Sequence, residues 1–226
     1  PFEHSANKRA KQSVTEIKRL RESRDEYSST DIIPFKFKTT FERPRFMQKN
    51  AKGLTKTEIG SAMHTVMQHI DFSKNYNYES LKDFLAELVL KEFLTEEEAE
   101  AIQIENVLTF LATDLGQKLK TATKIHRELP FTMKLLAKEV YPDWQDQSDE
   151  YVLIQGVIDC LIESEEGYIL LDYKTDTITQ NTTEEMLKKR YATQVELYRK
   201  AVEQIWKINL KHVYLYFFDR NLFIEQ

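Results

Sequence analysis

Two short stretches of the sequence place acidic side chains among apolar residues of the kind found in strands. Residues 156–159 read Gly-Val-Ile-Asp, and residues 171–174 read Leu-Asp-Tyr-Lys. Side chains on a strand alternate between its two faces, so Asp172 and Lys174 share one face. A carboxylate inside an apolar strand is uncommon without a partner. We therefore expect Asp159, Asp172 and Lys174 to form a site in which carboxylate oxygens hold a divalent metal and a phosphodiester meets an activated water.

A β-hairpin is expected to bring the two stretches together. Glu165-Glu-Gly167 has the composition of its turn, and Gly167 suits a left-handed backbone position there. Pairing around this turn places Asp159 opposite residues 171–173. The chemistry requires the register in which Asp159 lies on the Asp172 side, because a one-residue slip reverses the faces. The alternative for Asp172 and Lys174 is a salt bridge on an exposed face of the sheet. In the metal site, Lys174 would orient the water or stabilise developing negative charge.

Two helices supply further candidates. His64 follows Gly60 by one helical turn on the same face, and the glycine leaves room for a close neighbour such as a sheet edge or a metal. Gln194 and Tyr198 share one face of a later helix, from which an amide would reach the metal-bound water or the phosphate. The alternatives are a histidine satisfied within the core and a helix face that packs on the sheet.

Apolar periodicity predicts the elements that must position these residues. Helices are expected at 13–22, 55–70, 79–93, 96–120 (broken near 103) and 182–206, and strands at 124–133, 151–163, 168–175 and 210–219. Capping-box sequences open the helices at 13, 55 and 95. Residues 1–12 are expected to be frayed, 23–50 to form an extended crossing segment and 137–150 a surface loop. The expected fold is α/β, with the order helix, three strands, helix, strand and a helical insert after the first helix.

Composition limits the classes of protein that this chain can represent. Its 226 residues suit one sizeable core with an appended helical part. The net charge of −5 argues against a free-standing nucleic-acid binder that relies on bulk positive potential, although an acidic metal site is compatible with it. The single cysteine excludes an internal disulfide, a zinc cluster of thiolates and a four-cysteine iron–sulfur site. Without a signal peptide or an apolar run of membrane-spanning length, an intracellular, cytoplasmic protein with no membrane contact is expected. The start at Pro1 without Met suggests a domain cut from a longer protein.

Four motifs, taken in order, resemble those of the RecB-type PD-(D/E)xK nucleases. They are the G-x-x-x-H helix ending at His64, Gly-Val-Ile-Asp159, Asp-Tyr-Lys174 and Gln194-Val-Glu-Leu-Tyr. Segments 13–19, 43–46 and 57–60 are similar, more specifically, to AddA-type helicase–nuclease subunits of bacteria, in which the nuclease domain is C-terminal. The resemblance covers essentially all of residues 1–226. It implies a restriction-endonuclease-like core, with an N-terminal helix and crossing segment in 1–50, a helical part bearing His64 in 55–120 and the catalytic sheet and helix in 124–219.

The resemblance also implies roles for individual residues. His64, Asp159, Asp172 and the backbone carbonyl of Tyr173 would coordinate Mg²⁺, with Mn²⁺ or Ca²⁺ as alternative occupants. Lys174 would be the catalytic lysine. The helix motif would be supplied by Gln194 and Tyr198, and Glu128 on the preceding strand resembles a family glutamate near the site.

By the same resemblance the chain would act on DNA in double-strand break repair and recombination. It would cut single strands, the 3′-terminated strand in particular, that are fed to it by the helicase part of the parent chain in complex with an AddB-type partner subunit. Related AddB-type nuclease domains carry a four-cysteine iron–sulfur cluster, which this chain cannot form. Two alternatives stay open: a catalytically silent module that docks a partner subunit, and a restriction-type endonuclease on the same core.

Overall fold

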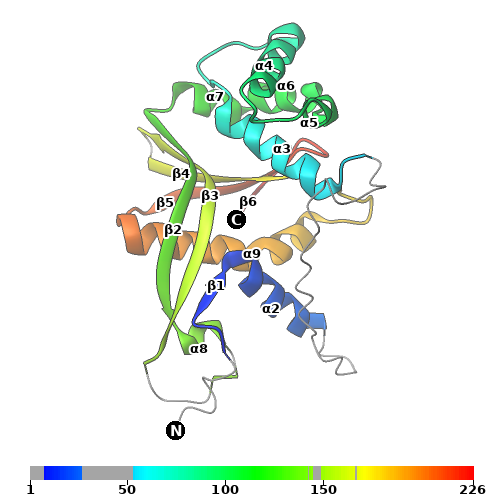
Figure 1. Cartoon of the computed structure of the whole chain (residues 1–226). Helices are drawn as coiled ribbons and strands as arrows, with labels where there is room; N and C mark the ends of the chain where they lie inside the picture. The colour runs from blue at the N-terminus through cyan, green and yellow to red at the C-terminus, as the bar shows by residue number, and fades with distance from the viewer. Residues whose placement is uncertain (1–7, 27–52, 142, 145–148, 166) are drawn as a thin grey trace.

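The computed structural model describes residues 8–26, 53–141, 143–144, 149–165 and 167–226. Figure 1 shows a twisted sheet with α3 to α7 on one side and α2 and α9 on the other. Within the described residues the sheet has the order β1-β3-β4-β5-β6, with β2 paired to β3 outside this path. The strands are β1 (Lys11–Ser13), β2 (Lys124–Leu136), β3 (Tyr151–Ser164), β4 (Gly167–Lys174), β5 (Leu210–Phe217) and β6 (Leu222–Glu225).

The helices form two groups. We call α3 to α7 the helical lobe. The helices are α2 (Val14–Glu26), α3 (Lys56–His69), α4 (Tyr78–Leu90), α5 (Glu96–Ala101), α6 (Ile104–Ala112), α7 (Asp114–Thr121), α8 (Ala137–Val140) and α9 (Glu184–Ala201), which continues into the π-helical turn η2 (Val202–Trp206). Among the described residues, no helix combines the length and the apolar character needed to cross a bilayer.

Both faces of the sheet are buried against helices, which explains the continuous apolar runs in its strands. The α9-side core contains Ile17 of α2 and Leu197 of α9 together with Leu170 of β4. The lobe-side core contains Phe110 of α6 together with Ile162 of β3. Two separate cores therefore share one sheet, and residues at the boundary between them belong to neither.

Most of the predicted elements are confirmed. The order of three strands, helix and strand holds, and all three predicted capping boxes form. In the first, Glu16 N donates to Ser13 Oγ at 3.1 Å and Ser13 N donates to the Glu16 carboxylate at 2.8 Å. Thr55 and Thr95 cap α3 and α5 in the same way. Gly167 has φ +122°, the left-handed conformation predicted for the hairpin turn.

Several boundaries differ from the predictions. The first helix runs to Glu26 rather than residue 22, the segment predicted as one helix from 96 to 120 is broken at residue 113 as well as near 103, and the last helix ends as α-helix at Ala201. The surface loop expected at 137–150 instead begins with the short helix α8, anchored by the buried Val140 and Tyr141. The crossing segment predicted for 23–50 falls, beyond Glu26, outside the described residues.

Strand β1 was not expected, since residues 1–12 are polar and basic. It pairs in parallel with β3, and Gln12 is buried because its amide donates a hydrogen bond to the Tyr141 hydroxyl at 2.9 Å. A three-residue polar strand satisfied by a distant tyrosine leaves no trace in apolar periodicity. Strand β6 was missed too, being a four-residue addition at the sheet edge.

Candidate active site

The edge of β3 opens at Asp159. Along this edge β3 pairs with β1 at residues 153–155 and with β4 at residues 160–164, and the positions between have neither partner. Here the alternation of side chains also changes phase, because Ile158 lies in the α9-side core and Cys160 in the lobe-side core. Regular alternation would place these two residues on one face. Asp159 therefore lies where the strand switches faces, clear of both cores.

A matching irregularity lies across from it on β2. Arg127 pairs with Cys160 and Leu129 pairs with Ile158, which leaves Glu128 at the level of Asp159. Glu128 has φ +45°, a left-handed conformation that non-glycine residues adopt rarely. Such backbone conformations persist where the surrounding structure enforces them, and they are frequent at functional sites.

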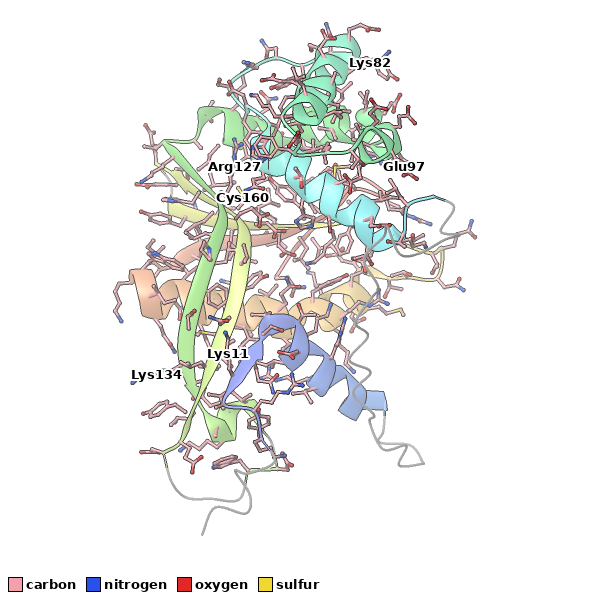
Figure 2. The ribbon with its side chains drawn as sticks, viewed as in Figure 1. Lys11, Lys82, Glu97, Arg127, Lys134 and Cys160 are labelled. Carbon is pink, nitrogen blue, oxygen red and sulfur yellow. The ribbon has the colours of Figure 1, made fainter. Side chains whose placement is uncertain are left out.

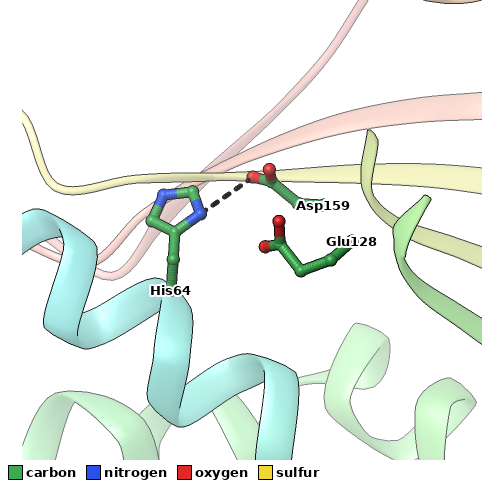
Figure 3. A group of neighbouring side chains, drawn as sticks. All are labelled: His64, Glu128 and Asp159. Carbon is green, nitrogen blue, oxygen red and sulfur yellow. Dashed lines mark ion pairs between the residues drawn. The ribbon is translucent and has the colours of Figure 1, made fainter. Parts of the chain in front are cut away.

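Three side chains from three elements converge at this opening (Figure 3). His64 comes from α3, Glu128 from β2 and Asp159 from β3, and one potential ligand atom from each lies within 4.8 Å of the others. The Nδ1 atom of His64 is 3.5 Å from the Oδ2 atom of Asp159. The same Asp159 oxygen accepts a hydrogen bond from the backbone N–H of Tyr173 at 2.8 Å, which ties it to β4.

Close packing of α3 against β4 sets the position of His64. A Cβ atom added to Gly60 would lie 2.7 Å from the Thr175 Oγ1 atom, so only glycine lets the helix approach this closely. The predicted close neighbour of Gly60 is thus the end of the sheet. One turn later, the side chain of His64 retains 31% exposure, which separates it from a fully enclosed core histidine.

A second polar group lies on the side of α9. Asp172, only 1% exposed, forms an ion pair with Lys174. The Gln194 amide nitrogen donates to Asp172 Oδ1 at 3.0 Å and to the Tyr198 hydroxyl at 3.0 Å, and its oxygen accepts from Lys174 Nζ at 3.1 Å. The alternative of an exposed salt bridge is therefore wrong, because Asp172 is buried. Gln194 and Tyr198 both face the sheet, as their helical spacing predicted.

The two groups adjoin where β3 and β4 separate. The ladder ends at Cys160 opposite Leu171, so the next positions along it are Asp159 and Asp172, within the predicted range of registers. Asp159 turns toward α3, and Asp172 toward α9. The compact group of potential ligands thus contains Glu128 in place of Asp172, which differs from the set expected from the sequence.

The charges of the two groups act on each other. Burial alone would lower the pKa of His64, but the hydrogen bond and charge of Asp159, together with the charge of Asp172, raise it. Burial also raises the pKa of Asp172, while the Lys174 ammonium opposes this change. For Glu128, burial and the neighbouring Asp159 carboxylate both raise the pKa. These shifts are the response expected where acidic groups and an imidazole crowd into one partly buried site.

Comparison with known proteins agrees with this arrangement. Residues 34–222 match the model of a family described as the PD-(D/E)XK nuclease superfamily. The chain belongs to the PD-(D/E)XK nuclease superfamily. It is 47% identical over 220 residues to the AddA-type ATP-dependent helicase/nuclease subunit of Oceanobacillus iheyensis, and 49% identical over 226 residues to the protein of the same name from Bacillus licheniformis. These alignments cover 96% and 97% of this chain but 18% of each relative, so the chain spans less than a fifth of their length.

PD-(D/E)XK nucleases generally use divalent metals, and the residues present here fit such an ion. Carboxylate oxygens and an imidazole nitrogen are ligands that Mg²⁺ and Mn²⁺ accept. Bonds to the rest of the protein also hold the ligands in place: Asp159 is fixed by the Tyr173 N–H and Asp172 by Gln194. Oriented ligands of this kind are typical of metal centres.

Sequence reasoning did not reveal two features of this PD-(D/E)XK site. The left-handed backbone of Glu128 has no sequence signal, because glutamate does not favour that conformation. Arg127 is the second: its guanidinium donates to the carbonyl oxygens of Gln68 and Ile70 at 2.7 and 2.6 Å. It thereby satisfies the C-terminal end of α3, and so fixes the helix that carries His64.

Proposed function

We propose that this chain is a Mg²⁺-dependent deoxyribonuclease domain that hydrolyses phosphodiester bonds in single-stranded DNA. The observation that supports this most is the convergence of His64, Glu128 and Asp159 beside the buried pair of Asp172 and Lys174. Mutually repelling acids are costly to bury unless a cation or a reaction requires them.

Each residue has a part in this proposal. His64, Asp159 and Asp172, with the Tyr173 carbonyl, would hold the metal, and Glu128 is close enough to His64 and Asp159 to join them. A bound divalent cation would lower the pKa of a water molecule and offset charge on the phosphate. Lys174 would orient that water or stabilise the negative charge that develops on the phosphate.

Gln194 has a positioning part. Its amide contacts Asp172 and Lys174 at once, so it fixes the distance between a metal ligand and the catalytic ammonium. Tyr198 in turn accepts a hydrogen bond from the Gln194 amide and holds its orientation. Rigid support of this kind keeps reacting groups within the narrow geometry that catalysis needs.

The proposal extends to the setting of the reaction. The relatives are named as subunits of an ATP-dependent helicase/nuclease, so we propose that this domain serves a helicase–nuclease that processes DNA double-strand breaks. Its substrate would be a single strand produced by unwinding, by resemblance the 3′-terminated one. Its partners would be the helicase part of the parent chain and an AddB-type subunit.

Digestion of single-stranded DNA tests the proposal. With Mg²⁺ we expect cleavage by the wild type and by Asp83→Ala, a matched control at an exposed position of α4, and loss of cleavage by orders of magnitude in Asp172→Ala. Equal cleavage by all three proteins, or none that depends on metal at any protein concentration, would favour the catalytically silent docking module instead.

A further inference from the structure

One face of the sheet below the site is open to solvent. Where β1, β3 and β2 lie side by side, Lys11, Leu153 and Lys134 form one row across the three strands, because Leu153 pairs with both lysines. All three are exposed, Leu153 to 47%. Nearer the site, Val157 and Pro130 form an exposed pair on the same face. We call the outward side chains of β1, of residues 130–134 and of residues 151–157 the open face.

The chemistry of the open face is cationic and hydrogen-bonding. Between the lysine row and the Val157 pair lies a row of Ser13, Gln155 and Thr132, which offers two hydroxyls and an amide. At the far end Tyr151 is 51% exposed, with the Lys134 ammonium 4.7 Å from the centre of its ring. None of these outward positions is acidic, although the chain as a whole carries a net charge of −5. Within the described residues, neither lysine of the face is paired with a carboxylate.

The open face leads directly to the candidate metal ligands. Along β3 the outward positions 151, 153, 155 and 157 are followed by Asp159, and along β2 Pro130 is preceded, two residues earlier, by Glu128. Six residues of strand separate Asp159 from Leu153, which corresponds to about 20 Å. Figure 2 labels Lys11 and Lys134 on the lower part of this ribbon, away from the helical lobe. A strand of DNA held on this face would therefore run into the site.

We infer that the open face binds the backbone of the single-stranded DNA whose phosphodiester enters the site, an inference that rests on the proposed nuclease function. The two ammoniums would contact phosphates, and the hydroxyl and amide row would donate hydrogen bonds to further phosphate oxygens. The exposed Tyr151, Leu153 and Val157 offer stacking and apolar contact to bases without reading sequence. A nucleic-acid strand fits better than a protein surface, because the lysines flank the apolar residues and the face continues to the acidic cluster.

Binding measured in EDTA, where no strand is cut, tests the inference separately from catalysis. The probe is a fluorescent oligodeoxythymidine, titrated at several salt concentrations with the wild type and with Lys11→Ala/Lys134→Ala. Each phosphate contact on a single strand contributes about 0.7 to the slope of log K against log salt, so losing two should reduce the slope by about 1.4. The Lys11→Arg/Lys134→Arg variant, which keeps both charges, should retain the wild-type slope.

The matched control removes two exposed lysines from elsewhere, Lys82→Ala/Lys124→Ala, and should leave the slope nearly unchanged. With Mg²⁺, the Lys11/Lys134 alanine variant should show a raised KM on long single strands and unchanged hydrolysis of bis(p-nitrophenyl) phosphate, which is too small to reach the face. An unchanged slope, equal losses in both alanine pairs or no oligonucleotide binding by the wild type at low salt would overturn the inference. Failure of metal-dependent hydrolysis would count against the nuclease proposal, while the EDTA titration would still decide the role of the face.

Discussion

At the residue scale, the site depends on how a buried acid is balanced. Asp172 is almost fully enclosed, and its charge is met by one ammonium, that of Lys174, and one amide, that of Gln194. Removing one partner of such a pair leaves a buried charge without compensation, which costs more than the pair itself contributes. Chemistry and stability are therefore coupled at Asp172 more tightly than at His64, which is partly open to solvent.

Lys174→Ala should separate metal binding from turnover. Because an ammonium is not a metal ligand, we expect calorimetric titration with Mn²⁺ to give an affinity close to that of the wild type. Cleavage of single-stranded DNA should fall by orders of magnitude, since the lysine is proposed to act on the water or the phosphate. A thermal melt establishes that the variant is folded at the assay temperature. Lost Mn²⁺ affinity in a folded variant would contradict the role given to Lys174.

Cys160 should be chemically silent in the native protein. Its side chain is buried between strands, and burial raises the pKa of the thiol to about 12, so almost no thiolate forms at neutral pH. A thiol-specific chromogenic disulfide should find no reactive group in the folded chain and one group per chain in guanidinium. Native reaction at the rate of a free thiol would show that the opening at Asp159 admits reagents to the lobe-side core.

At the element scale, the approach of α3 to the end of β4 determines whether His64 reaches Asp159. Gly60→Ala should push the helix away from Thr175 and destabilise the protein by about 1–3 kcal/mol, the usual cost of overpacking. It should also weaken Mn²⁺ binding, because His64 lies one turn along the displaced helix. In the double variant Gly60→Ala/Thr175→Ala the clashing hydroxyl is gone, so both losses should be partly restored. Additive effects in urea melts of this cycle would exclude the direct contact.

The elements show what a sequence alone can reveal. The caps at Ser13, Thr55 and Thr95 were predictable because their pattern is local, and the long strands were predictable because both of their faces are buried. The phase change between Ile158 and Cys160 was not, because each residue is apolar and only the third dimension assigns it to a core. That switch, with the left-handed Glu128 opposite, explains why Glu128 rather than Asp172 joins His64 and Asp159 in the compact group.

At the scale of the whole molecule, helices far apart in sequence are joined on the α9 side of the sheet by a network of charges. Arg21 of α2 donates to the Glu196 carboxylate of α9 at 2.8 Å. Lys200 lies 3.1 Å from both Glu196 and Glu139, the latter on α8. The network links the first described helix, the short helix after β2 and the long helix that carries Gln194, so it supports the site from a distance.

This network should make part of the stability depend on pH. Burial alone would raise the pKa of Glu196, but hydrogen bonds and charges from Arg21 and Lys200 outweigh it and lower the pKa. A carboxyl with a lowered pKa in the folded state contributes stability above its unfolded pKa and loses it as pH falls through its folded pKa. Glu196→Gln should therefore be less stable than the wild type by up to about 1 kcal/mol near pH 7, a small value because the pair is half-exposed. Near pH 3 the difference should shrink toward zero. Urea melts at the two pH values, with the exposed Glu203→Gln as control, measure this, and a Glu196→Gln deficit that is the same at both would show that packing, not charge, accounts for it.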